Sequence, residues 1–112
     1  EYAAHGRDES PYPWGSAAPG SQLCWRSIRG RGTCHVASFP GGAFGLADMA
    51  GNVWEWTASH YSQDYSSGRT FTERVVRGGG WADTDPSTVR ATVRHKTSPT
   101  DRSPDLGFRC VK

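Results

Sequence analysis

The sequence predicts an α+β domain that is loop-rich and has little regular secondary structure. The 112-residue chain contains 14 Gly and 7 Pro, and these residues interrupt helices and strands. No stretch of a dozen residues has apolar side chains at helical spacing, and apolar alternation is confined to short segments. The length fits one small domain or part of one.

Three short elements are expected in the first 94 residues. Residues 1–6 look like the last turn of a helix that ends at Gly6. A short strand is predicted at 74–77, where two valines lie between two arginines. A half-buried strand is predicted at 88–94, because small apolar residues alternate there with arginines.

The rest of the C-terminal region predicts loops and a closing strand. The Gly-rich aromatic segment 44–56 carries no strand prediction, and the polar stretches 59–70 and 95–105 are expected to be surface loops. Leu106, Phe108 and Cys110 alternate, which predicts a final strand with these side chains inward.

Composition excludes some functional classes. Hydrophobic residues make up 35% of the chain, so the core is expected to depend on tryptophan rings. These are Trp14, Trp25, Trp54, Trp56 and Trp81. A net charge of +2 is too small to predict nucleic-acid binding. No apolar run approaches the ~20 residues of a membrane-spanning helix, so no membrane span is expected.

The cysteine count is odd, at three, so at least one thiol lacks a partner within the chain. Cys24 and Cys34 enclose a turn-forming segment and are predicted to form a local disulfide. The alternatives are two reduced thiols or a zinc site with His35, although no further ligand spacing supports zinc. A disulfide would favour an extracellular or cell-surface location, whereas reduced thiols would fit the cytosol.

Five motifs occur in order along the whole chain. They are E-Y-A-A at 1–4, Y-P-W-G at 12–15, F-G-L-A-D-M-A-G-N-V-W-E-W at 44–56, R-V-V-R-G-G-G-W at 74–81 and G-F-R-C at 107–110. This string resembles the formylglycine-generating enzyme (sulfatase-modifying factor) family, which implies a variant of the C-type-lectin fold. In that family E-Y-A-A ends a helix in mid-domain. The resemblance therefore implies that residues 1–112 are the C-terminal part of a single domain, with its N-terminal half as the expected partner.

The resemblance also bears on catalysis. Family enzymes oxidise a substrate cysteine with a copper-binding cysteine pair that follows the R-G-G-S-W motif. The matching positions here are Asp83 and Thr88. A carboxylate is a hard ligand and a threonine hydroxyl has no accessible redox couple, whereas thiolates select Cu(I). We therefore do not expect this chain to generate formylglycine.

A calcium site is the family feature expected to persist. The resemblance assigns it to the carboxylates of Asp48 and Glu55 and the carbonyls of Gly51 and Val53, and Ca²⁺ binds such oxygen donors. The alternative is purely structural: Asp48 caps the turn and Glu55 pairs with an arginine.

The function expected from these features is a non-catalytic, lectin-like domain that binds a protein or peptide. Its ligand surface would comprise Trp81, Asp83, Thr84, Asp85, Ser87, Arg90 and Arg94, since polar side chains around an aromatic residue suit adaptable recognition. One alternative is an enzyme of the formylglycine-generating or iron-dependent sulfoxide synthase type that needs its missing half. The other is a regulatory domain attached to a kinase or protease.

Overall fold

The computed structural model describes residues 1–25, 32–62 and 72–110. Its elements are α1 (Tyr2–His5), β1 (Trp54–His60), β2 (Arg74–Arg77), the 3₁₀ helix η1 (Pro86–Val89), β3 (His95–Thr97) and β4 (Leu106–Gly107). Long irregular segments connect these short elements, as the glycine and proline content predicts. In the described part of the chain, no helix is long and apolar enough to cross a membrane.

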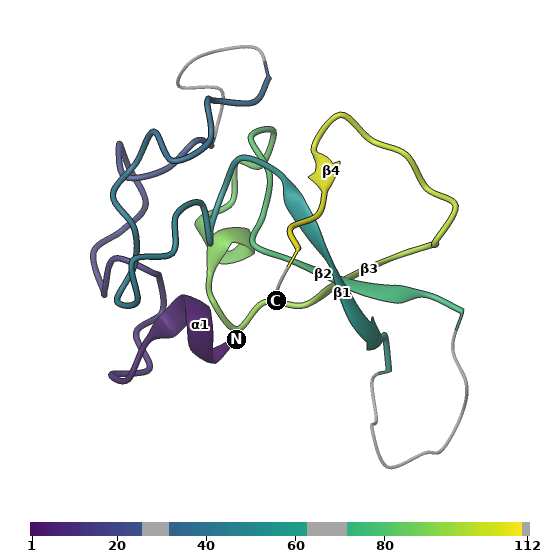
Figure 1. Cartoon of the computed structure of the whole chain (residues 1–112), viewed down its shortest axis with the longest axis horizontal. Coiled ribbons are helices and arrows are strands. Elements are labelled where there is room, and N and C mark those ends of the chain that lie inside the picture. Colours follow the sequence, from purple (N-terminus) through teal and green to yellow (C-terminus); the bar gives the residue numbers. More distant parts are fainter. Residues whose placement is uncertain (26–31, 63–71, 111–112) are drawn as a thin grey trace.

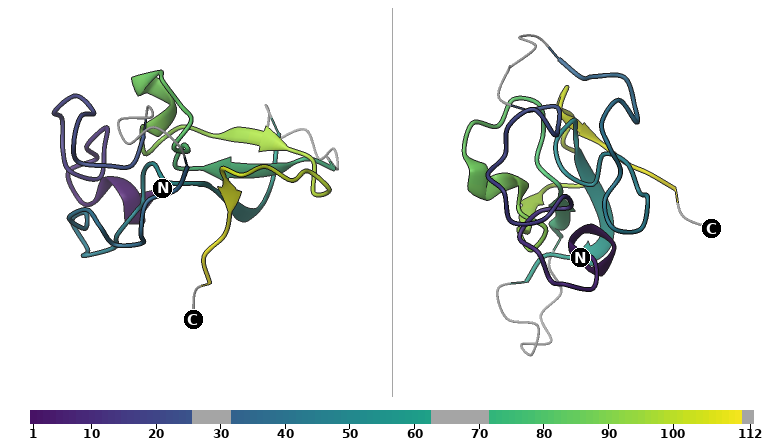
Figure 2. Two further views of the ribbon diagram at one scale, coloured as in Figure 1. Left: turned by 90° about the horizontal axis from the view of Figure 1, so that it is seen from above. Right: turned by 90° about the vertical axis from the view of Figure 1, so that its left-hand side faces the viewer.

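The strands form one four-stranded sheet in the order β3-β2-β1-β4. β1 pairs antiparallel with β2, β2 pairs antiparallel with β3, and β4 runs parallel to β1. Figures 1 and 2 show α1 and the irregular N-terminal loops at one end of the molecule and the sheet at the other. Residues 98–105, here called the arch, connect β3 at one edge of the sheet to β4 at the opposite edge.

The N-terminal helix ends as predicted. Gly6 has φ 73°, and its N–H donates to the carbonyl of Tyr2 at 3.0 Å. A Cβ at this position would lie 2.7 Å from the Cβ of Ala43. Glycine therefore ends α1 for two reasons: its backbone is left-handed, and Ala43 approaches it too closely for a side chain.

The core depends less on tryptophan than the composition suggests. Its main cluster contains Tyr12, Leu23, Trp25, Ala50 and Val89, with Trp14 packed against it. Of the five tryptophans only Trp25 is buried, and the other four are half-buried. The most completely buried large side chains are the valines of β2 and η1, because compact branched side chains fit the narrow spaces beside the sheet.

The strand predicted at 88–94 is wrong. The chain forms η1 instead, because the Asp85 carboxylate accepts the Ser87 N–H at 2.8 Å and Pro86 occupies the first helical position. Both features start a helix. The inward face was assigned correctly, since Val89 is fully buried and Ala91 is 7% exposed.

Two loop predictions and one strand prediction also need correction. The polar segment 95–105 contributes β3, whose residues pair with β2 at the sheet edge. β1 extends from the aromatic segment into residues expected to be loop, because its partner strands supply the hydrogen bonds. The closing strand is confined to Leu106 and Gly107, whereas Phe108 is 74% exposed and Cys110 is exposed. Residues 63–70 of the predicted loop lie outside the described part.

The start of the arch is stabilised by Asp101. Its carboxylate accepts hydrogen bonds from the Thr97 hydroxyl at 2.5 Å and the Ser98 N–H at 2.9 Å. These two bonds, the Thr97 bond first, lower the pKa of Asp101 below 3.8. A lowered folded-state pKa means that the carboxylate stabilises the fold above the unfolded-state pKa and loses this effect as the pH falls through the folded-state value.

We therefore expect Asp101→Asn to be less stable than the parent at pH 7 and to approach it below pH 3.8. Urea unfolding at pH 7 and at pH 3 measures the difference. An Asp8→Asn variant is the matched control, since Asp8 is an exposed aspartate. An unchanged gap between Asp101→Asn and the parent at both pH values would contradict the prediction.

Candidate metal and ligand sites

The loop that leads into β1 is shaped by three positions with a left-handed backbone. Asp48, Gly51 and Asn52 have φ values of 53°, 77° and 67°. The Gly51 N–H donates to Gly78 O at 2.8 Å, and a Cβ on Gly51 would lie 2.6 Å from the Cys24 carbonyl oxygen. Only glycine fits there without moving the backbone.

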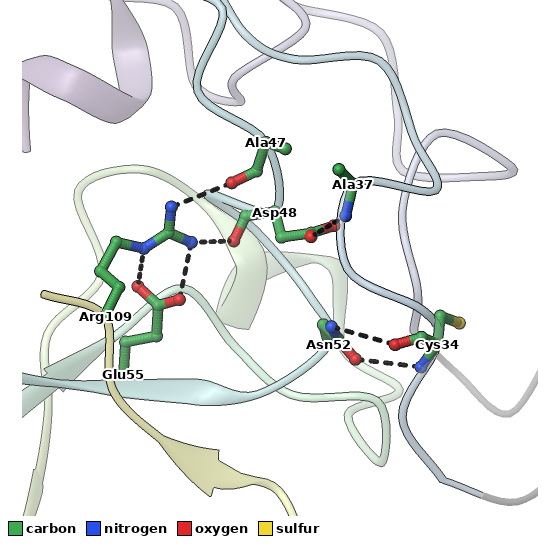
Figure 3. Close-up of polar contacts among 7 residues, drawn as sticks. All are labelled: Cys34, Ala37, Ala47, Asp48, Asn52, Glu55 and Arg109. Carbon is green, nitrogen blue, oxygen red and sulfur yellow. Dashed lines mark hydrogen bonds and ion pairs between the residues drawn. The ribbon is translucent and has the colours of Figure 1, made fainter.

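The predicted disulfide between Cys24 and Cys34 is present. Asn52, buried at 7% exposure, links it to the loop: its side chain accepts the Cys34 N–H at 3.0 Å and donates to the Cys34 carbonyl at 3.4 Å (Figure 3). The Asn52 N–H donates to Cys24 O at 2.8 Å, and its carbonyl accepts the Trp81 N–H at 2.9 Å. One buried residue thus connects the disulfide, the loop and the segment after β2.

Arg109 contacts two of the predicted calcium residues, Asp48 and Glu55 (Figure 3). Its guanidinium donates to both oxygens of the Glu55 carboxylate, at 2.7 and 2.6 Å, and to the carbonyls of Ala47 and Asp48 at 3.0 and 2.9 Å. The bidentate bond to Glu55 raises the pKa of Arg109. This geometry is the arginine pairing that formed the structural alternative to calcium.

The oxygen donors nevertheless match a hard cation in kind. A Cβ on Gly78 would lie 3.4 Å from the Met49 carbonyl oxygen and 3.9 Å from that of Val53, so these carbonyls converge beside a side-chain-free position. Asp48 uses one carboxylate oxygen to accept the Ala37 N–H at 2.7 Å, so its side chain also caps a turn. The described residues include no cluster of three His, Cys, Asp or Glu side chains suited to a metal ion. Calcium here would depend on backbone carbonyls and on sharing Glu55 with Arg109, and it stays a prediction.

The two positions that match the family's cysteine pair are close in space. The Asp83 carboxylate and the Thr88 carbonyl oxygen both lie 3.4 Å from where a Cβ of Gly79 would be. Asp83 accepts the Gly80 N–H at 2.7 Å, and the Thr88 hydroxyl donates to Asp85 O at 2.8 Å. These side chains hold a turn and η1, and their oxygens do not fit a Cu(I) ion that prefers soft sulfur ligands.

The predicted ligand surface is only partly continuous. Four of its residues are exposed around the start of η1: Thr84, Asp85, Ser87 and Arg90. Trp81 and Asp83 are half-buried, and the Trp81 indole N–H points to the Pro104 carbonyl at 3.5 Å. Arg94 belongs elsewhere, because its guanidinium donates to Ser62 O at 3.2 Å and lies 5.2 Å from the centre of the Tyr61 ring.

Sequence reasoning did not identify Arg109 or Asn52 as site residues. Arg109 reaches Glu55 because β4 pairs with β1 and places Gly107 opposite Glu55, a pairing that no local pattern reveals. For Asn52 a signal existed: an asparagine after glycine in a turn often adopts positive φ and uses its side chain locally.

Comparison with known proteins agrees with this geometry. The family model described as "Sulfatase-modifying factor enzyme 1-like domain" matches residues 1–112. The chain is 35% identical over 130 residues to "Inactive C-alpha-formylglycine-generating enzyme 2" of Bos taurus, and the alignment covers 99% of this chain and 40% of the relative. It is 32% identical over 143 residues to the "Formylglycine-generating enzyme" of Mycobacterium tuberculosis, which covers 99% of this chain and 48% of the relative.

Among solved structures, "Treponema denticola variable protein 1" superposes with a TM-score of 0.79 at 28% identity, and the match covers 96% of this chain and 42% of that chain. The chain thus spans less than half the length of the proteins it matches. Because the family model matches the chain from end to end, the chain belongs to the sulfatase-modifying factor family.

Proposed function

We propose that this chain is a non-catalytic binding domain of its family, with a protein or peptide as ligand. The observation that carries the proposal is the use of Asp83 and Thr88 at the positions of the redox cysteines. Both side chains are engaged in local hydrogen bonds, and no cysteine lies between Cys34 and Cys110. The C-type-lectin-like variant of the fold is part of the same proposal.

The direct test is an assay for formylglycine. The chain, and any longer polypeptide that contains it, is incubated with copper and a peptide carrying the Cys-x-Pro-x-Arg sequence, and products are identified by mass spectrometry. We expect no conversion. Conversion would overturn the proposal and would mean that the oxidative chemistry uses thiols from outside the Asp83 and Thr88 positions.

Calcium is proposed as a stabiliser of the loop between Asp48 and Glu55. Its donors would be the carboxylates of Asp48 and Glu55 and the carbonyls of Gly51 and Val53. The Glu55 carboxylate is also used by Arg109. We expect the melting temperature of the parent to be higher in millimolar Ca²⁺ than in EDTA. This difference between the two solutions should be larger for Arg109→Gln, because the Glu55 carboxylate is then released from the arginine. Equal melting temperatures in both solutions for both proteins would rule the site out.

The N-terminal half of a larger domain is the proposed partner. Apolar side chains are exposed near α1, where Tyr2 lies 5.2 Å from Phe44 between ring centroids and Leu46 is 41% exposed. Exposed apolar side chains of this kind are typical of an interface. The lengths of the matched relatives, more than twice that of this chain, support the same proposal.

A further inference from the structure

A groove lies between the sheet and the arch, at the opposite end of the molecule from α1. Side chains alternate along strands, and the pairing of Trp56 with Val76 places both on one sheet face. One cavity of about 500 Å³ is lined by Trp56, residues 101–104 and residues 106–108. A second, shallower cavity of about 430 Å³ is lined by Trp56, Thr57, Ala58, Arg74 and Pro99. Trp56 lines both cavities, so they lie next to each other on either side of this side chain, and together they are called the groove.

The floor and one wall of the groove are apolar. Trp56 is half-buried between the two cavities, and Leu106 and Phe108 follow along β4 and its end. Phe108 is 74% exposed, so a large aromatic side chain borders the groove without being covered by any described residue. The volume is within the range of ligand sites, and an exposed aromatic residue beside a half-buried one suits an apolar side chain of a partner.

An arginine lies at each end of the groove, Arg74 in one cavity and Arg102 in the other. Arg74 donates to the Ala58 carbonyl at 2.8 Å and Arg102 to the Asp101 carbonyl at 3.0 Å. In the ranges 1–25, 32–62 and 72–110, ion pairs within 4.0 Å involve other basic residues and neither of these two guanidiniums. The Asp101 carboxylate lines the same cavity as Arg102 and offsets its formal charge, although it is turned to Thr97 and Ser98. The lining of the groove therefore keeps a net positive charge, which lies at Arg74.

We propose that this groove binds an extended acidic peptide segment, with an apolar side chain against Trp56 and Phe108 and carboxylates toward Arg74 and Arg102. The inference rests on the proposed binding function and moves the ligand from the exposed residues around η1 to the sheet. Arginine suits this role because its planar fork pairs bidentately with carboxylates. The indole N–H of Trp81 reaches the arch at Pro104, so the segment after β2 supports one wall of the groove.

The test uses two synthetic peptides, acetylated and amidated: Glu-Glu-Leu-Phe-Glu-Glu and its counterpart with lysine at each glutamate. Isothermal titration calorimetry at about 0.1 M salt measures both, since screening weakens exposed charge pairs at higher salt. We expect the acidic peptide to bind at least about tenfold more tightly than the lysine peptide. Equal affinities, or no binding of either peptide, would overturn the proposal.

Three single variants in the groove and two control variants locate the site. Arg74→Gln and Arg102→Gln are expected to lower the affinity for the acidic peptide about fivefold or more. Phe108→Ser is expected to lower it similarly, because the apolar contact is lost. Phe108 lies at the surface, so its loss does not disturb the core. Arg7→Gln is the matched control, because Arg7 is exposed near α1. Val36→Ser controls for Phe108, as Val36 is 82% exposed and does not line the groove. Wild-type affinity in all three groove variants would overturn the proposal.

Two other occupants give different results. Self-association that depends on concentration and disappears in Phe108→Ser, measured by analytical ultracentrifugation, would assign the groove to a second copy. Peptide binding by the 112-residue chain that is lost in a longer polypeptide containing it would assign the groove to that polypeptide's own segments. Either result overturns the peptide proposal, whereas the formylglycine assay alone decides whether the domain is non-catalytic.

Discussion

Arg109→Gln is expected to lower the free energy of unfolding by about 2–3 kcal/mol. The guanidinium donates to four oxygens from two segments of the chain, the Glu55 carboxylate and the carbonyls of Ala47 and Asp48. Its side chain is 34% exposed and that of Glu55 21%, so the pair is screened by solvent only in part. Removing the arginine leaves a half-buried carboxylate without its counter-ion, which costs more than an exposed ion pair contributes.

A double-mutant cycle with Glu55→Gln separates the pair from the carbonyl contacts. Because each single change already breaks the bidentate bond, we expect the double variant to cost little more than Arg109→Gln alone. Arg7→Gln, at an exposed arginine just after α1, is expected to change stability by less than about 0.5 kcal/mol. Urea unfolding measures the parent, the three variants of the cycle and this control. Additive effects of the two single changes would contradict a shared interaction.

Removal of the Cys24–Cys34 disulfide, by reduction or by Cys24→Ser with Cys34→Ser, is expected to cost about 3 kcal/mol. The bridge spans a sequence separation of 10, and the model of unfolded-chain entropy predicts that amount for a loop of this size. Asn52 bonds to the backbone of both cysteines. We therefore expect the loop before β1 and the environment of the neighbouring Trp25 to change as well.

Urea unfolding with and without dithiothreitol measures the loss, and tryptophan fluorescence in the absence of urea reports the local change. Cys110→Ser is the matched control, because Cys110 is a free and exposed cysteine whose removal breaks no bond within the described residues. If the parent protein were equally stable with and without dithiothreitol, the loop before β1 would be held by its noncovalent contacts alone.

Features decided by neighbours in sequence could be predicted from the sequence. The end of α1 at Gly6, the strand of paired valines in β2 and the local disulfide each depend on residues within about ten positions. Glycine frequency predicted the loop-rich chain for the same reason, since backbone freedom is a property of single residues. The motif string carried the family, which the comparisons then showed.

Features decided by contacts between distant segments could not be predicted in this way. One local signal was also missed: alternating apolar residues fit both a strand and η1, and the adjacent Asp85 cap with Pro86 favours the helix. Polar residues 95–97 became β3 because β2 offered an edge, and exposure of Phe108 follows from how the chain leaves β4.

The central charge pair illustrates the same division. A pairing of Glu55 with some arginine was the structural alternative to calcium at the sequence level. That the partner is Arg109, 54 positions away, depends on the parallel pairing of β4 with β1. The motif string thus indicated the family and local pattern indicated the short elements. The partners of the contacts and the groove under the arch were decided by long-range strand pairing, which depends on segments far apart in the sequence.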